Sequence, residues 1–86
     1  MPPALDAQDF QSMTASAKDL ARARQSLIEE LDAITLYENR IQATQDPELK
    51  KLLTHNRDEE KEHTAMLIEY LRKNDPTFDQ KFFEHD

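Results

Sequence analysis

Glu30, Glu60 and His63 are polar residues at positions where the surrounding helical pattern requires apolar side chains. Glu60 and His63 are three residues apart, a spacing that places both side chains on one face of an α-helix. A buried carboxylate without a partner is costly, and a bound cation removes that cost. Carboxylate oxygens and imidazole nitrogen, in a chain without cysteine, favour iron, manganese or zinc over copper(I) or calcium. The three residues are therefore candidate metal ligands.

Proline positions divide the chain into predicted helices. Asp46-Pro47 and Asp75-Pro76 each place an N-cap residue before a proline at the first helical position. We predict long helices over about residues 16–45 and 47–74 and a short one over about 76–84, with the first able to begin several residues earlier. Residues 1–10 are expected to be frayed. The chain has no glycine, which disfavours the tight turns of an all-β fold, so we expect one all-α domain over residues 1–86.

Each long helix carries a stripe of residues spaced alternately by three and four, as in the core positions of helical bundles. The first stripe passes through Leu20, Ala23, Leu27, Glu30, Ile34, Tyr37 and Ile41. The second passes through Leu49, Leu53, Asn56, Glu60, His63, Leu67 and Tyr70. The polar residues in these stripes are the three candidate ligands and Asn56, which we interpret as a buried residue that fixes helix register.

A short connection near residues 44–46 predicts that the two long helices form an antiparallel hairpin. Glu30 lies 16 residues before Asp46 and His63 lies 16 residues after Pro47, so the candidate ligands fall at nearly one level. Two helices cannot enclose both stripes, and we therefore expect a four-helix bundle completed by dimerisation. A two-fold dimer doubles the ligand set to the six side chains of di-iron carboxylate bundles.

The composition excludes several classes of function. The net charge is −7, which argues against nucleic acid as a partner. Without cysteine the chain forms neither a disulfide framework nor a thiolate metal site. No apolar run is long enough to span a membrane, and the first residues lack the features of a signal peptide. We therefore expect a location in the cytoplasm or in a compartment enclosed within it.

Three segments together resemble the encapsulated ferritins: Glu29 through Tyr37, Asp46 through Leu49, and His55 through His63. The resemblance covers roughly residues 25–75. It implies two-helix subunits that dimerise around a ferroxidase centre, with the dimers assembled into a ring-shaped decamer. It also implies that the ring sits inside a protein shell, the encapsulin nanocompartment, where the ferric mineral accumulates.

The same resemblance implies roles for individual residues. Matched by motif, the iron ligands are Glu30, Glu60 and His63, and Tyr37 lies close to the centre. The remaining matches line the entry route of the metal: Glu29, Asp32 and His55. Two residues depart from the family pattern, because Leu36 stands where a tryptophan can occur and Asp32 where a glutamate can occur. We expect these changes to alter metal entry or rate without changing the ligands.

Near the end of the chain, Phe78 and Phe82 form an aromatic pair at helical spacing, for which we predict contacts within the ring. The last five residues do not form the short apolar tail of an encapsulin-docking peptide. Either such a peptide belongs to a longer chain, or cargo loading is not encoded here.

The sequence thus predicts a ferroxidase that oxidises Fe(II) to Fe(III) with oxygen at a di-iron site across a homodimer interface, with zinc, manganese or calcium able to occupy the same ligands. The alternative is a non-catalytic helical oligomer stabilised by metal, in which the ion compensates buried charge and zinc or calcium would serve equally well. A peroxide-consuming di-iron protein is less favoured, because the chain has no cysteine for a second, thiolate-bound redox site.

Overall fold

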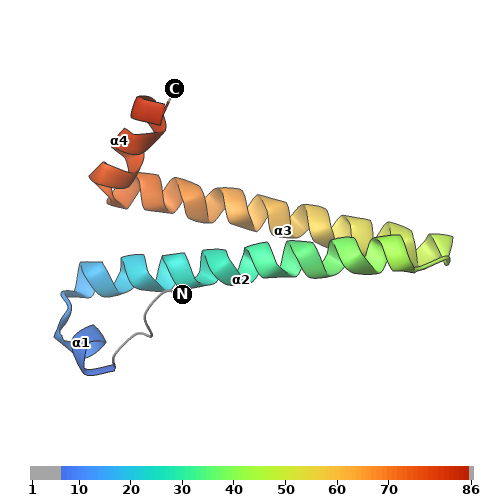
Figure 1. The fold of residues 1–86 in the computed structure, drawn as a ribbon, viewed down its shortest axis with the longest axis horizontal. Helices are drawn as coiled ribbons and strands as arrows, with labels where there is room; N and C mark the ends of the chain where they lie inside the picture. The colour runs from blue at the N-terminus through green and yellow to red at the C-terminus, as the bar shows by residue number, and fades with distance from the viewer. Residues whose placement is uncertain (1–6, 86) are drawn as a thin grey trace.

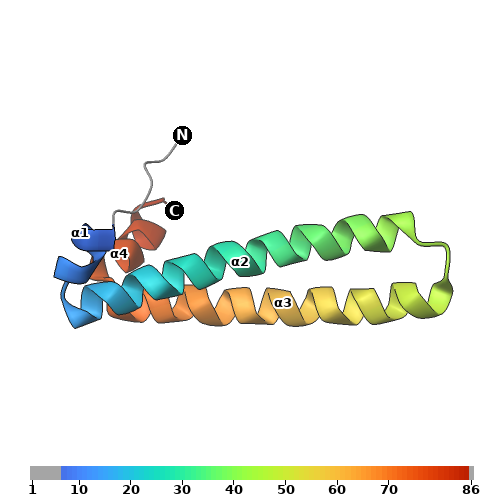
Figure 2. The same ribbon diagram turned by 90° about the horizontal axis from the view of Figure 1, so that it is seen from below.

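The computed structural model describes residues 7–85 as helices with short connections. In chain order these are α1 (Ala7–Ser12), α2 (Ala15–Ala43), α3 (Pro47–Asn74) and α4 (Pro76–His85). No β-strand occurs among the described residues. The two long helices, α2 and α3, run side by side as an antiparallel hairpin, with their connection at one end and the two short helices at the other (Figures 1 and 2). The predicted all-α class with two long helices is confirmed.

Side-chain caps account for where the helices begin. The hydroxyl of Thr14 accepts a hydrogen bond from the Ala17 backbone N–H at 3.2 Å, which starts α2. The Asp46 carboxylate accepts from the Glu48 N–H at 3.0 Å, and the Asp75 carboxylate accepts from the Phe78 N–H at 3.1 Å. Each of these bonds satisfies a backbone donor that a helix start leaves unpaired. The bounds of α3 match the prediction, whereas α2 ends at Ala43, two residues earlier than predicted.

The expectation of a frayed start is wrong for residues 7–10, which belong to α1; residues 1–6 lie outside the described part of the chain. Phe10 explains how so short a helix is held, because its ring lies 5.8 Å from the ammonium of Lys18 and 5.8 Å from the guanidinium of Arg22. Both cations come from the first turns of α2. Such cation–π contacts give a short segment an anchor that helical periodicity does not reveal.

The seam between α2 and α3 repeats at 18 residues. Its most buried members are Ala23 and Ile41 on α2, and Leu53, Thr64 and Leu71 on α3. Ala23 and Ile41 are 18 residues apart, as are Leu53 and Leu71, which is five turns at about 3.6 residues per turn. Leu71, which the predicted stripe leaves out, is buried in this seam, whereas the stripe residue Tyr70 is 40% exposed in the single chain. A heptad repeat of 3.5 residues per turn drifts off a straight helix by about 20° per heptad. Over the three heptads from Leu49 to Tyr70 the drift is about 60°, which leaves Leu71 closer to the seam than Tyr70.

One arginine attaches α4 to the end of α3. The Nε of Arg72 donates to the Asp79 carboxylate at 2.7 Å, and its guanidinium lies 4.3 Å from the centre of the Phe82 ring. Phe78 and Phe82 pack edge to face with their centres 5.3 Å apart, so Phe82 contacts its own chain on two sides. Phe83 is 67% exposed. The predicted role of Phe78 and Phe82 in contacts between subunits of the ring-shaped assembly stays a prediction.

None of the helices described is both long enough and apolar enough to cross a membrane.

Leu71 should contribute more to stability than any neighbouring residue of α3, because its side chain is 3% exposed. Leu71→Ala is expected to lower the free energy of unfolding by about 2–5 kcal/mol, whereas the volume-conserving Leu71→Met should cost less than about 1.5 kcal/mol. Urea denaturation followed by circular dichroism measures both. The exposed Lys73→Ala serves as the control, and equal stability of the two Leu71 variants would contradict the seam described above.

Candidate metal centre

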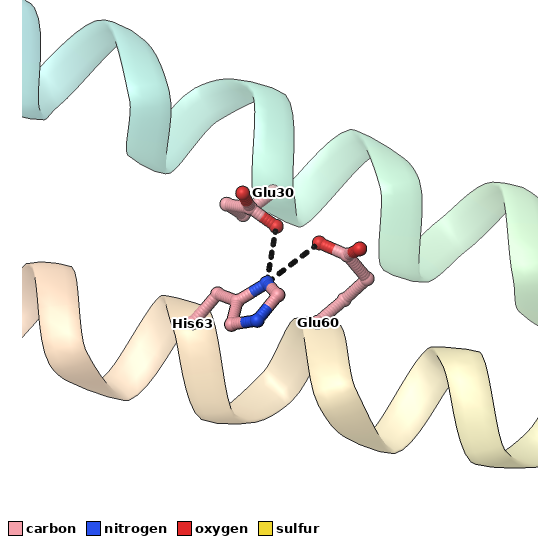
Figure 3. Close-up of side chains that lie close together, drawn as sticks. All are labelled: Glu30, Glu60 and His63. Carbon is pink, nitrogen blue, oxygen red and sulfur yellow. Dashed lines mark ion pairs between the residues drawn. The ribbon is translucent and has the colours of Figure 1, made fainter.

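Glu30, Glu60 and His63 meet in the middle of the hairpin. Glu30 extends from α2, and the other two extend toward it from α3 (Figure 3). His63 Nδ1 lies 3.6 Å from Glu30 Oε2 and 3.5 Å from Glu60 Oε2. One ligand atom from each residue lies within 4.8 Å of the other two. The structure thus brings together the three residues that the sequence proposed as metal ligands.

The carboxylates of this group are the more shielded members. The Glu60 and Glu30 side chains are 21% and 27% exposed, whereas the His63 side chain is 48% exposed. Glu30 Oε2 is buried and accepts no hydrogen bond from any described residue. Leaving a buried acceptor without a partner costs about 1–3 kcal/mol, and more for a charged group. The site therefore favours a positive species at Glu30 Oε2.

The spacing of the three groups suits a metal ion better than direct hydrogen bonds. The two N···O distances exceed the usual hydrogen-bond range of about 2.7–3.2 Å. Ligands bound about 2.0–2.2 Å from one metal ion stand about 3–3.5 Å from each other, close to the separations here. Two oxygen donors and one nitrogen donor on rigid helices thus fit a first-row metal.

The other sequence-predicted residues do not join this group. Within the described chain, the only cluster of three or more such side chains that could hold a metal is Glu30, Glu60 and His63. Glu29 is exposed and accepts a hydrogen bond from Gln25 at 3.1 Å, and Asp32 is exposed. His55 is exposed and lies 3.6 Å from its neighbour Glu59 on α3. Their roles on an entry route, and the role of the half-buried Tyr37 beside the centre, remain predictions.

An apolar face next to the cluster was only partly recognised in the sequence. A groove of about 520 Å³ opens beside Glu30 and His63 and is otherwise lined by Ser26, Met66, Leu67 and Tyr70. Met66 is 60% exposed. Leu49, His63 and Tyr70 belong to the predicted stripe, and Leu52 and Met66, each three residues beyond one of them, lie on the same face of α3. These five residues, called the open face of α3 below, place the candidate ligands within an uncovered apolar surface.

A second charged contact crosses the hairpin near the cluster. Arg57 Nη1 donates to the Glu38 carboxylate on α2, and Arg57 Nε donates to Asp58 at 3.1 Å. The bond to Glu38, followed by the bond to Asp58, raises the pKa of Arg57 above its ordinary value. The guanidinium therefore remains charged throughout the pH range in which the protein would be studied. Asn56, the predicted register residue, is half-buried and makes no side-chain hydrogen bond to a described residue.

Comparisons with known proteins agree with this arrangement. The EncFtn-like family model matches residues 6–85. A Thermotoga maritima ferritin-like protein is 47% identical over 68 residues, which is 79% of this chain and 60% of that protein. A Rhodospirillum rubrum encapsulated ferritin-like protein is 53% identical over 64 residues, which is 74% of this chain and 43% of that protein.

Two further matches extend the comparison. An encapsulin nanocompartment cargo protein of Myxococcus xanthus is 46% identical over 59 residues, which is 67% of this chain and 45% of that protein. A crystal structure of a Nitrosomonas europaea protein superposes with a TM-score of 0.85 at 44% identity, covering 96% of this chain and 89% of that one. The chain spans 43% to 60% of the length of the curated relatives that it matches. The family match and these identities establish that the chain belongs to the EncFtn-like family of encapsulin-associated ferritin-like proteins.

Proposed function

We propose that two copies of this chain pair across the open face of α3 and form a di-iron centre that oxidises Fe(II) to Fe(III) with oxygen. The observation that carries the proposal is the buried Glu30 Oε2, which accepts no hydrogen bond from any described residue and faces an imidazole and a second carboxylate. Ferrous ions are the substrate. Each loses one electron, and two together supply the two electrons that, with two protons, convert one oxygen molecule to hydrogen peroxide.

The ligand count supports pairing. One chain offers two carboxylates and one imidazole, half of the set that di-iron bundle proteins use. In a two-fold dimer each ligand of one copy has an equivalent in the other, so Glu30, Glu60 and His63 would bind two ions between them. In this proposal the two carboxylates and the imidazole of each copy would hold the ions, and the negative carboxylates would offset their positive charge. His63 must bind as neutral imidazole, so metal binding releases any proton it carries.

The exposed apolar residues support the same pairing. Leu52 and Met66 on the open face are 55% and 60% exposed, and burial of such side chains drives association. Tyr37 lies seven residues from Glu30, about 10 Å along α2, and we assign it a place beside the centre only in the paired state. Glu29, Asp32 and His55 are assigned to the entry route.

The family match and the exposed surface of α2 support proposals for further assembly and location. We propose that the dimers form a ring-shaped decamer, which needs a second interface on each subunit. Ile28 and Leu31 of α2 are 52% and 49% exposed and offer apolar surface for it. The names of two relatives describe encapsulated or encapsulin cargo proteins, which supports an encapsulin shell protein as partner and an encapsulin nanocompartment as the location.

Oxidation of ferrous iron by the metal-free protein tests the proposed activity. Ferric absorbance and oxygen uptake should rise rapidly after aerobic addition of Fe(II), and Glu30→Gln, Glu60→Gln and His63→Ala should each reduce the rate to that of buffer. Glu62→Gln removes an exposed carboxylate from the same helix and should retain the wild-type rate. Rates equal to buffer for every protein would reject the ferroxidase and favour the non-catalytic metal-stabilised oligomer.

The proposed pairing is tested by Met66→Glu, which adds one negative charge to the open face. We expect it to lower the dimer fraction of the metal-free protein at least about tenfold in sedimentation velocity, because an unpaired buried charge opposes association. Gln42→Glu adds the same charge to an exposed position elsewhere and should leave the dimer intact. Pairing through another face is indicated if both variants dimerise like the wild type.

A further inference from the structure

We infer that the ion pair between Arg57 and Glu38 is a positioning device that sets the register of α2 against α3 for the metal site. This inference rests on the proposed function for its purpose, because a ligand set divided between two helices is useful only in one register. Glu30 comes from α2, whereas Glu60 and His63 come from α3. Sliding one helix by a single residue would move Glu30 by about 1.5 Å, far beyond the tolerance of about 0.2 Å in metal–ligand distances.

The pair is well placed for this role. The Arg57 side chain is 22% exposed and lies three residues, less than one turn, before Glu60 on α3. It reaches Glu38, which lies eight residues, about two turns, beyond Glu30 on α2. The contact therefore crosses the seam between the candidate ligands and the connection of the hairpin. Arg57 and His63 are six residues apart and therefore point about 120° apart around α3. The two polar contacts thus hold the hairpin from different sides.

The rest of the seam is less able to fix the register. Its buried residues are Ala23, Ile41, Leu53, Thr64 and Leu71, of which four are apolar, and apolar contact is not directional. Thr64 donates its hydroxyl to the Glu60 carbonyl oxygen of its own helix at 2.9 Å and makes no cross-helix hydrogen bond. Polar pairs inside helical interfaces are well suited to specifying register.

Only two ion pairs join α2 to α3 among the described residues: Glu38 with Arg57, and Glu30 with His63. The second consists of candidate ligands, and a metal ion would replace it. The Arg57 pair uses no ligand atom and can persist in both states. Its second partner, Asp58, lies on the same helix and steadies the guanidinium without affecting register.

Cobalt(II) binding to the full chain tests the inference with a readout that does not depend on iron oxidation. Arg57→Gln and Glu38→Gln should each weaken Co²⁺ binding about 10- to 100-fold, as loss of groups that orient ligands does, and should alter the visible ligand-field spectrum of the bound ion. The exchanged pair, Glu38→Arg with Arg57→Glu, should restore both affinity and spectrum. Asp58→Asn is the matched control and should change affinity less than about twofold. A folded Arg57→Gln protein with wild-type affinity and spectrum would overturn the inference.

A second measurement examines the register without any metal. The chain has no cysteine, so spin labels can be attached at Asn39→Cys on α2 and Glu62→Cys on α3, both exposed. Doubly labelled subunits are diluted with unlabelled chain so that the distance between the two labels of one subunit is measured. In Arg57→Gln this distance should shift by about 1.5 Å or more, or its distribution should broaden, and the exchanged pair should restore the wild-type distance. An unchanged distance in Arg57→Gln would likewise reject the inference. If the label distance responds as expected while the wild type does not oxidise iron, the register role stands and the proposed function fails.

Discussion

The buried carboxylate oxygen Glu30 Oε2 is the constraint around which the candidate metal centre is arranged. Helix α2 carries it into the seam, where it is shielded from water and accepts no hydrogen bond from the described residues. The stability of a helical hairpin gains nothing from such a group by itself, because a leucine at the same position would bury apolar surface at no electrostatic cost. The carboxylate makes physical sense when it faces a cation, and the neighbouring carboxylate of Glu60 strengthens that requirement.

The same constraint explains why a hairpin of this kind would exist as half of a larger unit. A chain of 86 residues buries little core by itself, and four apolar residues of the described range 7–85 are buried. The open face of α3 adds exposed leucine and methionine beside the candidate ligands. Exposed apolar side chains and the candidate ligands therefore lie on one surface. A second copy bound there would cover the apolar side chains and would add three further candidate ligands. Pairing and metal binding become coupled, because each would stabilise the state that the other requires.

Sequence reasoning succeeded where a local rule determines the outcome. An aspartate before a proline specifies a helix start almost independently of tertiary structure, so the bounds of α3 were predictable. Counting residues from the turn was enough to place Glu30 beside Glu60 and His63, because both helices rise equally per residue. It failed where small angular errors accumulate, as at Leu71, which the predicted stripe left out of the seam. The sequence also did not show that Arg57, and not Asn56, makes the polar contact across the seam. Neighbouring residues of a helix point about 100° apart around its axis, and packing decides which of the two faces the other helix.

The use of a charged pair for register follows from the chemistry of the site. An apolar register residue would have to fit tightly against α2, and a tight fit beside ligands that change between a bare and a metal-bound arrangement would resist that change. An arginine and a glutamate fix the offset through a directional bond, while their flexible side chains accommodate small rotations of the helices. The pair also adds no net charge near the carboxylates, so it leaves their attraction for a cation largely intact. In this view Arg57 fixes how far Glu30 of α2 lies along the hairpin relative to Glu60 and His63 of α3. Small movements of the ligand side chains then supply the final geometry around the metal.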